Sequence, residues 1–132
     1  MTQLGIDITS VKRIQALAAR RPRALKRLFT ENEVRDAGMG RQRWPRLAGR
    51  FAAKEALIKA ARGLHGGSYQ NIELRRRPGA PPQVTVSGLL REWLESKGYV
   101  VSISISHEDE FAVAIASLDA GGGEPGVAGL DS

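Results

Sequence analysis

The sequence predicts an α+β fold in which an antiparallel sheet packs against a long central helix. Three observations predict it. Apolar residues alternate with other residues at 4–8, which indicates a strand near the start of the chain. Residues with high helix propensity predominate over 45–62. Two further alternating segments, 101–106 and 111–116, flank a short acidic turn and predict a terminal hairpin.

The N-terminal half is predicted to be mainly helical after the first strand. Ser10 is a suitable N-cap for a first helix, and Pro22 ends that helix. Thr30 and Glu33 have the spacing of a capping box, which predicts that a short helix begins directly after Thr30.

The long helix is expected to begin near Pro45, which suits a first helical turn, and to continue to about Arg62. The glycine-rich segment 63–67 follows it. Glycine lets backbone amides approach a phosphate, but a helix C-terminus needs glycine equally often, so the segment supports both interpretations. The residues expected to form the buried stripe of this helix are Leu47, Phe51 and Ile58.

The C-terminal half is predicted to contain the remaining strands. Strands are expected at 72–76 and 84–86, joined by a turn at 78–82. A helix capped by Ser87 is expected to extend to Lys97, before the terminal hairpin.

Length and composition indicate one folded domain over residues 1–118, followed by a disordered tail at 119–132. The chain has 132 residues, of which 42% are hydrophobic, and it has no cysteine, so disulfides and thiolate zinc sites are excluded. No secretory signal and no apolar segment long enough for a membrane span is present. We therefore expect a cytoplasmic protein without membrane association.

Two acidic residues lie where a charge is unexpected. Asp7 interrupts the first strand, although aspartate is depleted in strands, and Glu55 falls beside the apolar stripe of the long helix. One interpretation is an ordinary ion pair between Glu55 and Lys59, with Asp7 solvated on an exposed sheet face. The other brings Asp7 and Glu55 together as oxygen ligands of Mg²⁺, which takes further ligands from water and substrate phosphates.

His107 ends the first strand of the hairpin, immediately before the acidic turn 108–110. A histidine at the mouth of a strand pair is either a site residue or an ordinary turn residue, and the sequence pattern by itself favours the turn.

The charge of the chain is strongly basic: 20 Lys+Arg and 14 Asp+Glu give a net charge of +6. Such a field attracts anionic partners. Nucleic acid is the less suitable partner, because aromatic residues make up only 5% of the chain and no stacking motif accompanies the arginines. An acidic protein is the other candidate. The basic residues that follow one another without an intervening acid are Lys12, Arg13, Arg20, Arg21, Arg23, Lys26 and Arg27.

Five motifs occur in a specific order. They are G-I-D-I at 5–8, F-T-x-x-E at 29–33, R-F-A-A-K-E-A at 50–56, I-E at 72–73 and S-I-S-H at 104–107. In this combination the sequence resembles the holo-[acyl-carrier-protein] synthases, the small single-domain type of 4'-phosphopantetheinyl transferase. The resemblance implies the fold of that family, and it extends from about residue 4 to about residue 116.

The resemblance also implies an activity: transfer of the 4'-phosphopantetheine group from coenzyme A, the co-substrate, to a serine of an acidic acyl carrier protein, with release of adenosine 3',5'-bisphosphate. It implies that Asp7 and Glu55 hold Mg²⁺ and that Lys59 stabilises or protonates the departing phosphate. It implies a homotrimer with sites at subunit boundaries. The coenzyme A ligands that it suggests are Arg50, Lys54, Lys59, Gly66, Gly67, Ser106 and His107. The carrier-protein docking residues that it suggests are Arg13, Arg20, Arg21 and Arg23, with Arg13 first among them.

Three positions depart from the family pattern. Ser10 and Asn71 stand where acidic residues are frequent, and Ala80 stands where a basic residue is common. These differences leave open which carrier protein is served, in fatty acid, polyketide or peptide synthesis. The sequence also leaves open the base that accepts the serine proton. Two alternatives to the enzyme are a catalytically altered member of the family that binds a carrier protein and, less favoured, a basic nucleic-acid-binding protein.

Overall fold

The structure is a computed structural model and describes residues 2–120. The N-terminal half contains one strand and four helices: β1 (Thr2–Ser10), α1 (Val11–Arg20), α2 (Pro22–Leu28), α3 (Glu31–Ala37) and α4 (Arg43–Ala61). The C-terminal half contains a short 3-10 helix, four strands and one α-helix: η1 (Tyr69–Asn71), β2 (Ile72–Arg75), β3 (Gln83–Val86), α5 (Gly88–Ser96), β4 (Tyr99–His107) and β5 (Phe111–Ala120).

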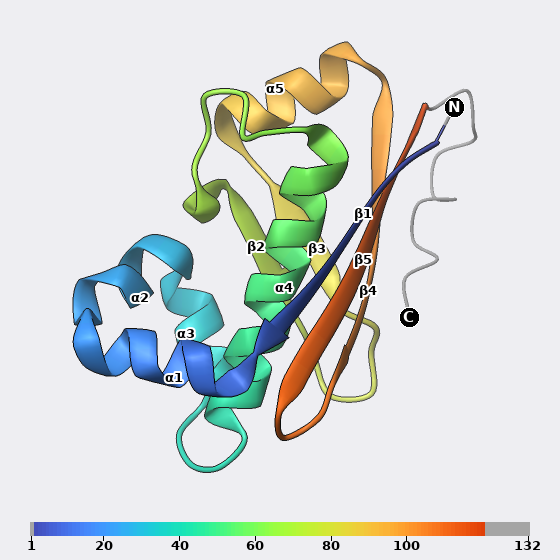
Figure 1. Ribbon diagram of the computed structural model, residues 1–132. Coiled ribbons are helices and arrows are strands. Elements are labelled where there is room, and N and C mark those ends of the chain that lie inside the picture. The colour runs from blue at the N-terminus through green and yellow to red at the C-terminus, as the bar shows by residue number, and fades with distance from the viewer. Residues whose placement is uncertain (1, 121–132) are drawn as a thin grey trace.

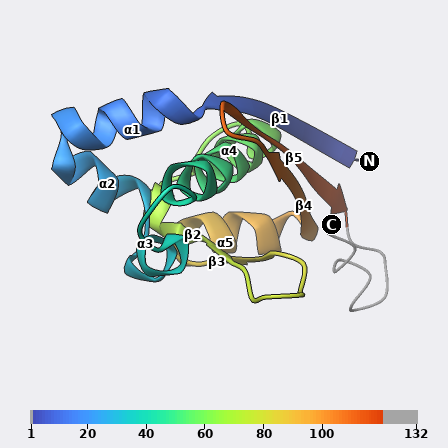
Figure 2. The ribbon, with the colours of Figure 1, turned by 90° about the horizontal axis from the view of Figure 1, so that it is seen from below.

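The strands form two separate antiparallel sheets. The larger sheet has the order β1-β5-β4, so that β5 lies in its middle between β1 and β4, and β2 pairs with β3 in the smaller one. Helix α4 lies in the middle of the molecule, across one face of the larger sheet, as Figure 1 shows. In the view from below, β2, β3 and α5 lie on another side of α4 than β1 (Figure 2). The predicted α+β class with a long central helix is confirmed.

Local sequence signals place several element boundaries, although α4 begins at Arg43 rather than near Pro45 and the Ser87 side chain makes no capping hydrogen bond to α5. The side chain of Ser10 accepts a hydrogen bond from the Arg13 backbone N–H, and Thr30 and Glu33 form the predicted capping box. Arg62, in the left-handed region at φ 59°, ends α4. Strand β5 continues to Ala120, two residues beyond the expected domain boundary at 118. The rest of the predicted tail, 121–132, lies outside the described residues.

The burial of α4 differs from the predicted stripe. Leu47 is fully buried, but Phe51 and Ile58 are only partly buried. Small residues of α4 are buried on almost every side of the helix. A Cβ at Gly5 of β1 would overlap with the carbonyl oxygen of Ala56, so β1 crosses α4 nearly backbone to backbone. The sequence pattern missed this because it assigned burial to large residues. The buried alanines of α4 are Ala48, Ala52, Ala53, Ala56, Ala60 and Ala61.

Strands β1 and β5 present most of their bulky apolar side chains away from α4, whereas Leu118 of β5 and Ile103 of β4 are buried. Small or polar residues of β1 and β5, such as Gly5 and Ala114, face the helix instead. Because successive residues of a strand alternate between faces, this places Asp7 on the inner face and corrects the expectation that an unpaired Asp7 would be solvated on an outer one. The exposed apolar residues of β1 and β5 are Leu4, Ile6, Ile8, Phe111, Val113 and Ile115.

None of the helices in residues 2–120 combines the length and the hydropathy that a bilayer crossing requires.

Candidate active site

Asp7 and Lys59 meet where β1 crosses α4. The Lys59 Nζ atom lies 3.0 Å from Asp7 Oδ1 and also donates to the carbonyl oxygen of Ile6 at 3.0 Å. The second carboxylate oxygen of Asp7 accepts a hydrogen bond from the Thr9 hydroxyl at 2.6 Å. The Asp7 side chain is 13% exposed and that of Lys59 is 53% exposed, so the carboxylate is held in place while the ammonium group can move.

Glu55 lies one helical turn before Lys59 but does not pair with it. Its Oε1 atom accepts a hydrogen bond from the phenol hydroxyl of Tyr69 in η1. The predicted ordinary ion pair between Glu55 and Lys59 is therefore wrong, because Lys59 pairs with Asp7 instead.

The two carboxylates act on the same phenol. The pKa of Tyr69 is raised to about 12, chiefly by burial, then by the hydrogen bond and the charge of Glu55, and last by the charge of Asp7. Because Glu55 lies one helical turn before Lys59, which contacts Asp7, the carboxylates of β1 and α4 lie in one neighbourhood with the ammonium group of Lys59. The structure brings together the three residues that the sequence predicted as catalytic.

This donor set suits Mg²⁺. Carboxylate oxygens are the ligands that this hard cation prefers, and it is commonly held by only one or two of them together with water and substrate phosphates. Within residues 2–120, no group of three or more His, Cys, Asp or Glu could hold a metal by itself. A cation bound by Asp7 and Glu55 would therefore take its remaining ligands from elsewhere.

Lys54 corrects a prediction. Its side chain is fully buried, and its Nζ atom lies 2.6 Å from Glu33 Oε1, 2.6 Å from the carbonyl oxygen of Leu28 and 3.1 Å from that of Tyr69. An ammonium group has three donors, and all of them are used. Lys54 thus joins α4 to α2, α3 and η1, and it cannot reach a coenzyme A phosphate in this conformation.

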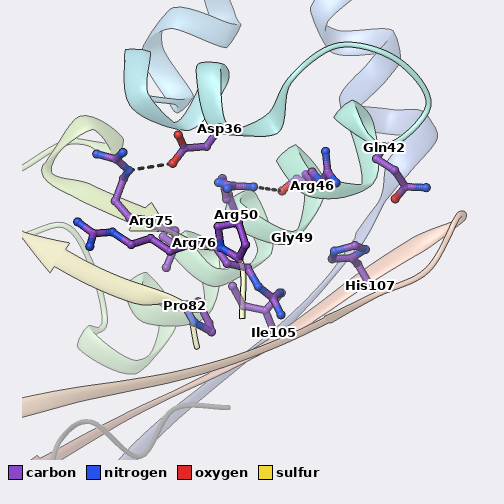
Figure 3. A pocket seen from close by; sticks show the side chains of 13 residues that line it. Asp36, Gln42, Arg46, Gly49, Arg50, Arg75, Arg76, Pro82, Ile105 and His107 are labelled. Atoms are coloured by element: carbon purple, nitrogen blue, oxygen red, sulfur yellow. Dashed lines mark hydrogen bonds and ion pairs between the residues drawn. The ribbon is translucent and has the colours of Figure 1, made fainter. Parts of the chain in front are cut away.

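A basic cavity of about 660 Å³ lies at the other side of α4. Arg50 and Gly49 of α4, Ile105 and His107 of β4, and the segment after β2 line it (Figure 3). Arg75 in this wall is paired with Asp36 at 2.8 Å. The further basic residues that line the cavity are Arg46, Arg76 and Arg77.

Arg50 and His107 have the properties of anion-binding groups. The Nε atom of Arg50 is buried without a hydrogen-bond partner, although its Nη1 atom donates to the carbonyl oxygen of Arg46 at 3.2 Å. Burial lowers the pKa of His107, and the charges of Arg76, Arg46 and Arg50 lower it further. An anion in the cavity would relieve the repulsion among these groups and would supply an acceptor for a buried donor.

None of the observations on Gly66, Gly67 and Ser106 connects these residues directly to a phosphate-binding site. A Cβ at Gly66 would lie 2.9 Å from Leu89 Cδ1, and one at Gly67 would lie 3.0 Å from Asn71 Oδ1, so packing against η1 and α5 accounts for both glycines. Ser106 is exposed on β4. Roles for these three residues in binding coenzyme A stay predictions.

The predicted docking arginines lie on the outer surface of α1 and at the junction with α2. Arg13, Arg20, Arg21 and Arg23 are all exposed. Residues 11–28 contain no acidic residue that could neutralise them. Their accessibility agrees with a docking role, which stays a prediction.

Sequence reasoning missed Tyr69 and the arginines beyond α4. Tyr69 lies in the short 3-10 helix η1, which has no periodic sequence pattern, and its contact with Glu55 depends on how the chain returns to α4. The run Arg75, Arg76, Arg77 was a visible signal, because three consecutive cations after a strand are costly to bring together without an anion.

Comparison with known proteins identifies the class. The family model of the 4'-phosphopantetheinyl transferase superfamily matches residues 3–116, and the chain therefore belongs to that superfamily. The holo-[acyl-carrier-protein] synthase of Caldanaerobacter subterraneus subsp. tengcongensis is 37% identical over 115 residues, which is 86% of this chain and 91% of that protein.

Solved structures agree with the sequence comparison. A holo-(acyl-carrier-protein) synthase from Bacillus anthracis in complex with CoA (3',5'-ADP) has a TM-score of 0.71 and 35% identity, covering 88% of this chain and 94% of that one. The Helicobacter pylori synthase in complex with coenzyme A has a TM-score of 0.75 and 29% identity, covering 88% and 99%. Within the superfamily, the chain is a transferase of the holo-[acyl-carrier-protein] synthase group.

Proposed function

We propose that the protein transfers the 4'-phosphopantetheine group of coenzyme A to a serine of an apo acyl carrier protein, with Mg²⁺ as cofactor and adenosine 3',5'-bisphosphate as the second product. The observation that carries the proposal is the convergence of Asp7, Glu55 and Lys59 where β1 crosses α4. The relatives crystallised with coenzyme A support the choice of co-substrate. The absence of cysteine agrees with the cytoplasm as the place of the reaction.

The reaction exchanges a phosphoanhydride bond for a phosphoester bond. The serine oxygen of the carrier protein bonds to the phosphorus on the pantetheine side of the diphosphate, and the bond from that phosphorus to the bridging oxygen breaks. The serine proton goes to a base, and the bridging oxygen leaves with the adenosine bisphosphate. Positioning and neutralisation of charge are the main catalytic requirements of such a transfer.

The residues divide these tasks. Asp7 and Glu55 would hold Mg²⁺, which when bound polarises the diphosphate as a Lewis acid. Lys59 would turn from Asp7 to the departing phosphate, and its half-exposed side chain allows that movement. One of the two carboxylates would accept the serine proton, directly or through a water molecule.

The basic cavity would bind the phosphates of coenzyme A. Arg50 offers an unpartnered buried donor, and His107 stands beside it among further arginines. An anion here would bind through charge-assisted hydrogen bonds, which are stronger than neutral ones.

The two halves of the site lie on opposite sides of α4 within one protomer. Arg50 and Lys59 are nine residues apart, which is about two and a half helical turns, so they project in opposite directions. In the sheet, Asp7 and Ile105 flank Ala114 from β1 and β4. One coenzyme A molecule that touches both halves would therefore require a neighbouring protomer.

We accordingly propose a homotrimer with the site at each subunit boundary. The exposed apolar face of β1 and β5 supports an obligate interface, because a monomer seldom exposes a patch of this kind without a partner. Light scattering of the purified chain would test the subunit number, and a monomer in solution with full activity would contradict the proposal.

Intact mass spectrometry tests the transfer directly. We expect the mass of an apo carrier protein to increase by one phosphopantetheine group when the enzyme, coenzyme A and Mg²⁺ are present, and to stay unchanged when EDTA replaces the metal. Glu55→Gln should abolish the increase while leaving the unfolding transition unchanged. No adduct on any of several carrier proteins would refute the proposed function and favour a catalytically altered member of the family.

Mixing two inactive variants tests the shared site. Glu55→Gln removes one half and Arg50→Ala the other, and each alone should be inactive. If each site takes one half from each of two protomers, a refolded equimolar mixture should regain about a quarter of the wild-type activity, because random assembly restores that share of boundaries. No recovery in a mixture that assembles normally would contradict the shared site.

Carrier-protein docking is assigned to the exposed arginines of α1. Arg13→Glu should raise KM for an acidic carrier protein and weaken its dependence on salt, because rim charges act mainly on encounter. KM for coenzyme A should stay unchanged. An equal rise in both KM values would contradict a docking role for Arg13.

A further inference from the structure

Tyr69 is held rigidly from three directions. Its ring stacks on Phe51, with the centroids 6.0 Å apart and the planes at 14°. Its carbonyl oxygen accepts a hydrogen bond from buried Lys54 at 3.1 Å. Its hydroxyl donates to Glu55. Consecutive residues of α4 thus fix the two ends of one tyrosine, and the aromatic stack fixes the plane of its ring.

We propose that Tyr69 is the positioning residue of the candidate metal site, whose hydroxyl fixes the Glu55 carboxylate so that Oε2 is presented to the cation. This inference rests on the proposed function, because it assumes that Glu55 is a ligand. Within residues 2–120, Oε1 of Glu55 accepts from Tyr69 and Oε2 has no hydrogen-bond partner. Tyr69 itself does not contact the reacting atoms.

The direction of this hydrogen bond follows from the two groups. An ionised carboxylate only accepts, and a phenol is protonated at neutral pH, so Tyr69 donates. A hydrogen bond of this kind leaves the negative charge of Glu55 available to a cation.

The energetic reason for a positioning residue is the flexibility of glutamate. Glutamate is among the side chains that lose the most rotamer freedom when they are fixed. If Tyr69 fixes Glu55 before the metal binds, that entropy is not lost on binding. Partners that orient metal ligands typically change metal affinity by 10- to 100-fold when they are removed.

The hydroxyl of Tyr69 can be removed without disturbing the other contacts that hold this residue. In Tyr69→Phe the ring still stacks on Phe51, and the backbone carbonyl still accepts from Lys54. The chain contains only one other tyrosine, Tyr99, whose hydroxyl accepts from Gln3 at 2.9 Å. Tyr99→Phe is therefore a matched control that removes one phenol hydroxyl away from Glu55.

The test measures binding of Mn²⁺, as a spectroscopic substitute for Mg²⁺, from the EPR signal of the free ion in the presence of coenzyme A and without carrier protein. Glu55→Gln defines the background from coenzyme A alone. We expect Tyr69→Phe to weaken Mn²⁺ binding by about 10- to 100-fold and to raise the Mg²⁺ concentration for half-maximal rate similarly. KM for the carrier protein should not change, and Tyr99→Phe should match wild type in both measurements.

A second readout follows the phenol itself. In the Tyr99→Phe background, Mg²⁺ should change the near-ultraviolet absorption of Tyr69, because the cation alters the charge that its hydroxyl contacts. The change should disappear in Tyr69→Phe/Tyr99→Phe and in Glu55→Gln/Tyr99→Phe. A spectrum that does not respond to metal would overturn the inference.

The outcomes separate the inference from the proposed function. If Glu55→Gln abolishes Mn²⁺ binding but Tyr69→Phe binds as tightly as wild type, or more tightly, Glu55 is a ligand and Tyr69 does not position it. If wild type binds no more Mn²⁺ than Glu55→Gln and forms no adduct on carrier proteins, the proposed function and the inference are overturned together.

Discussion

The buried ion pair between Lys54 and Glu33 allows the sharpest prediction, because burial gives it a large effect. Both side chains are 0% exposed, and their charged atoms are 2.6 Å apart. Lys54→Met keeps much of the side-chain volume but removes the charge and all three hydrogen bonds. Glu33 then keeps its bonds to the backbone N–H groups of Thr30 and Leu74 but has no counter-charge.

Removing one partner of a buried pair typically costs about 3 to 5 kcal/mol, because the other charge is left uncompensated. A domain of this size has an unfolding free energy of about 5 to 15 kcal/mol, so the loss is a large fraction of the total. At about 4 °C per kcal/mol, the melting temperature should fall by about 12 to 20 °C. Lys54→Met combined with Glu33→Gln should recover part of the loss, because no uncompensated charge remains.

Urea denaturation of wild type, the two single variants and the double variant measures the coupling between Lys54 and Glu33. A cost below about 1 kcal/mol for Lys54→Met would refute the reasoning, because the pair would then have to be solvated. A protein of normal stability whose KM for coenzyme A alone rises would instead support the predicted contact of Lys54 with the co-substrate.

Three further predictions concern other parts of the fold. Gly5→Ala should lower the unfolding free energy by about 2 kcal/mol or more, because its Cβ would overlap with the backbone of Ala56; denaturation unchanged within error would contradict this contact. Because the folded state lowers the pKa of His107, the unfolded state binds more protons, and stability should decrease as pH falls below about 6.5. His107→Gln should reduce that decrease between pH 7.5 and 5, and equal slopes would count against it. Ile115→Glu should dissociate the proposed trimer in light scattering, whereas Met39→Glu, on an exposed loop residue, should not; an intact Ile115→Glu trimer would exclude the β5 face from the interface.

The parts of the fold that could be predicted are those determined by neighbouring residues. The capping box of Thr30 and Glu33 depends on a spacing of three residues, and alternation in 101–106 depends on a period of two. Such signals are complete within one turn or one strand. They identify α3 and the central part of β4, which extends from Tyr99 to His107, because no distant segment overrides them.

The side of the sheet that is buried could not be predicted in the same way. Alternation in β1 separates Ile6 from Asp7 but does not say which face meets α4. Small residues permit the closest approach to a helix, so Gly5 and the alanines of β5 face α4, and most of the larger side chains of β1 and β5 are turned outward. An exposed apolar face of this kind usually marks an interface, which alternation within one chain does not specify.

The candidate site shows the same limit. The sequence motifs identified Asp7, Glu55 and Lys59. However, Lys59 pairs with Asp7 and not with Glu55, which is nearer in sequence, because β1 brings a carboxylate and a carbonyl oxygen to the same ammonium group. Lys54 is adjacent to Glu55 in sequence, yet it points to a buried acid 21 residues earlier. Neighbours on one helix therefore have a structural role and a proposed catalytic role, and only the tertiary contacts distinguish them.

Helix α4 links these observations, because it contributes residues to the acidic site on one side and to the basic cavity on the other, and lies between them. Its small residues allow β1 to pass close on one side, which brings Asp7 to Lys59, while Arg50 reaches the basic cavity on the other side. Larger side chains on α4 would move β1 away from the helix and would separate the carboxylates of Asp7 and Glu55. The same close packing turns most of the bulky apolar side chains of β1 and β5 outward. The feature that assembles one half of the site thus also creates the surface through which a second protomer would supply the other half.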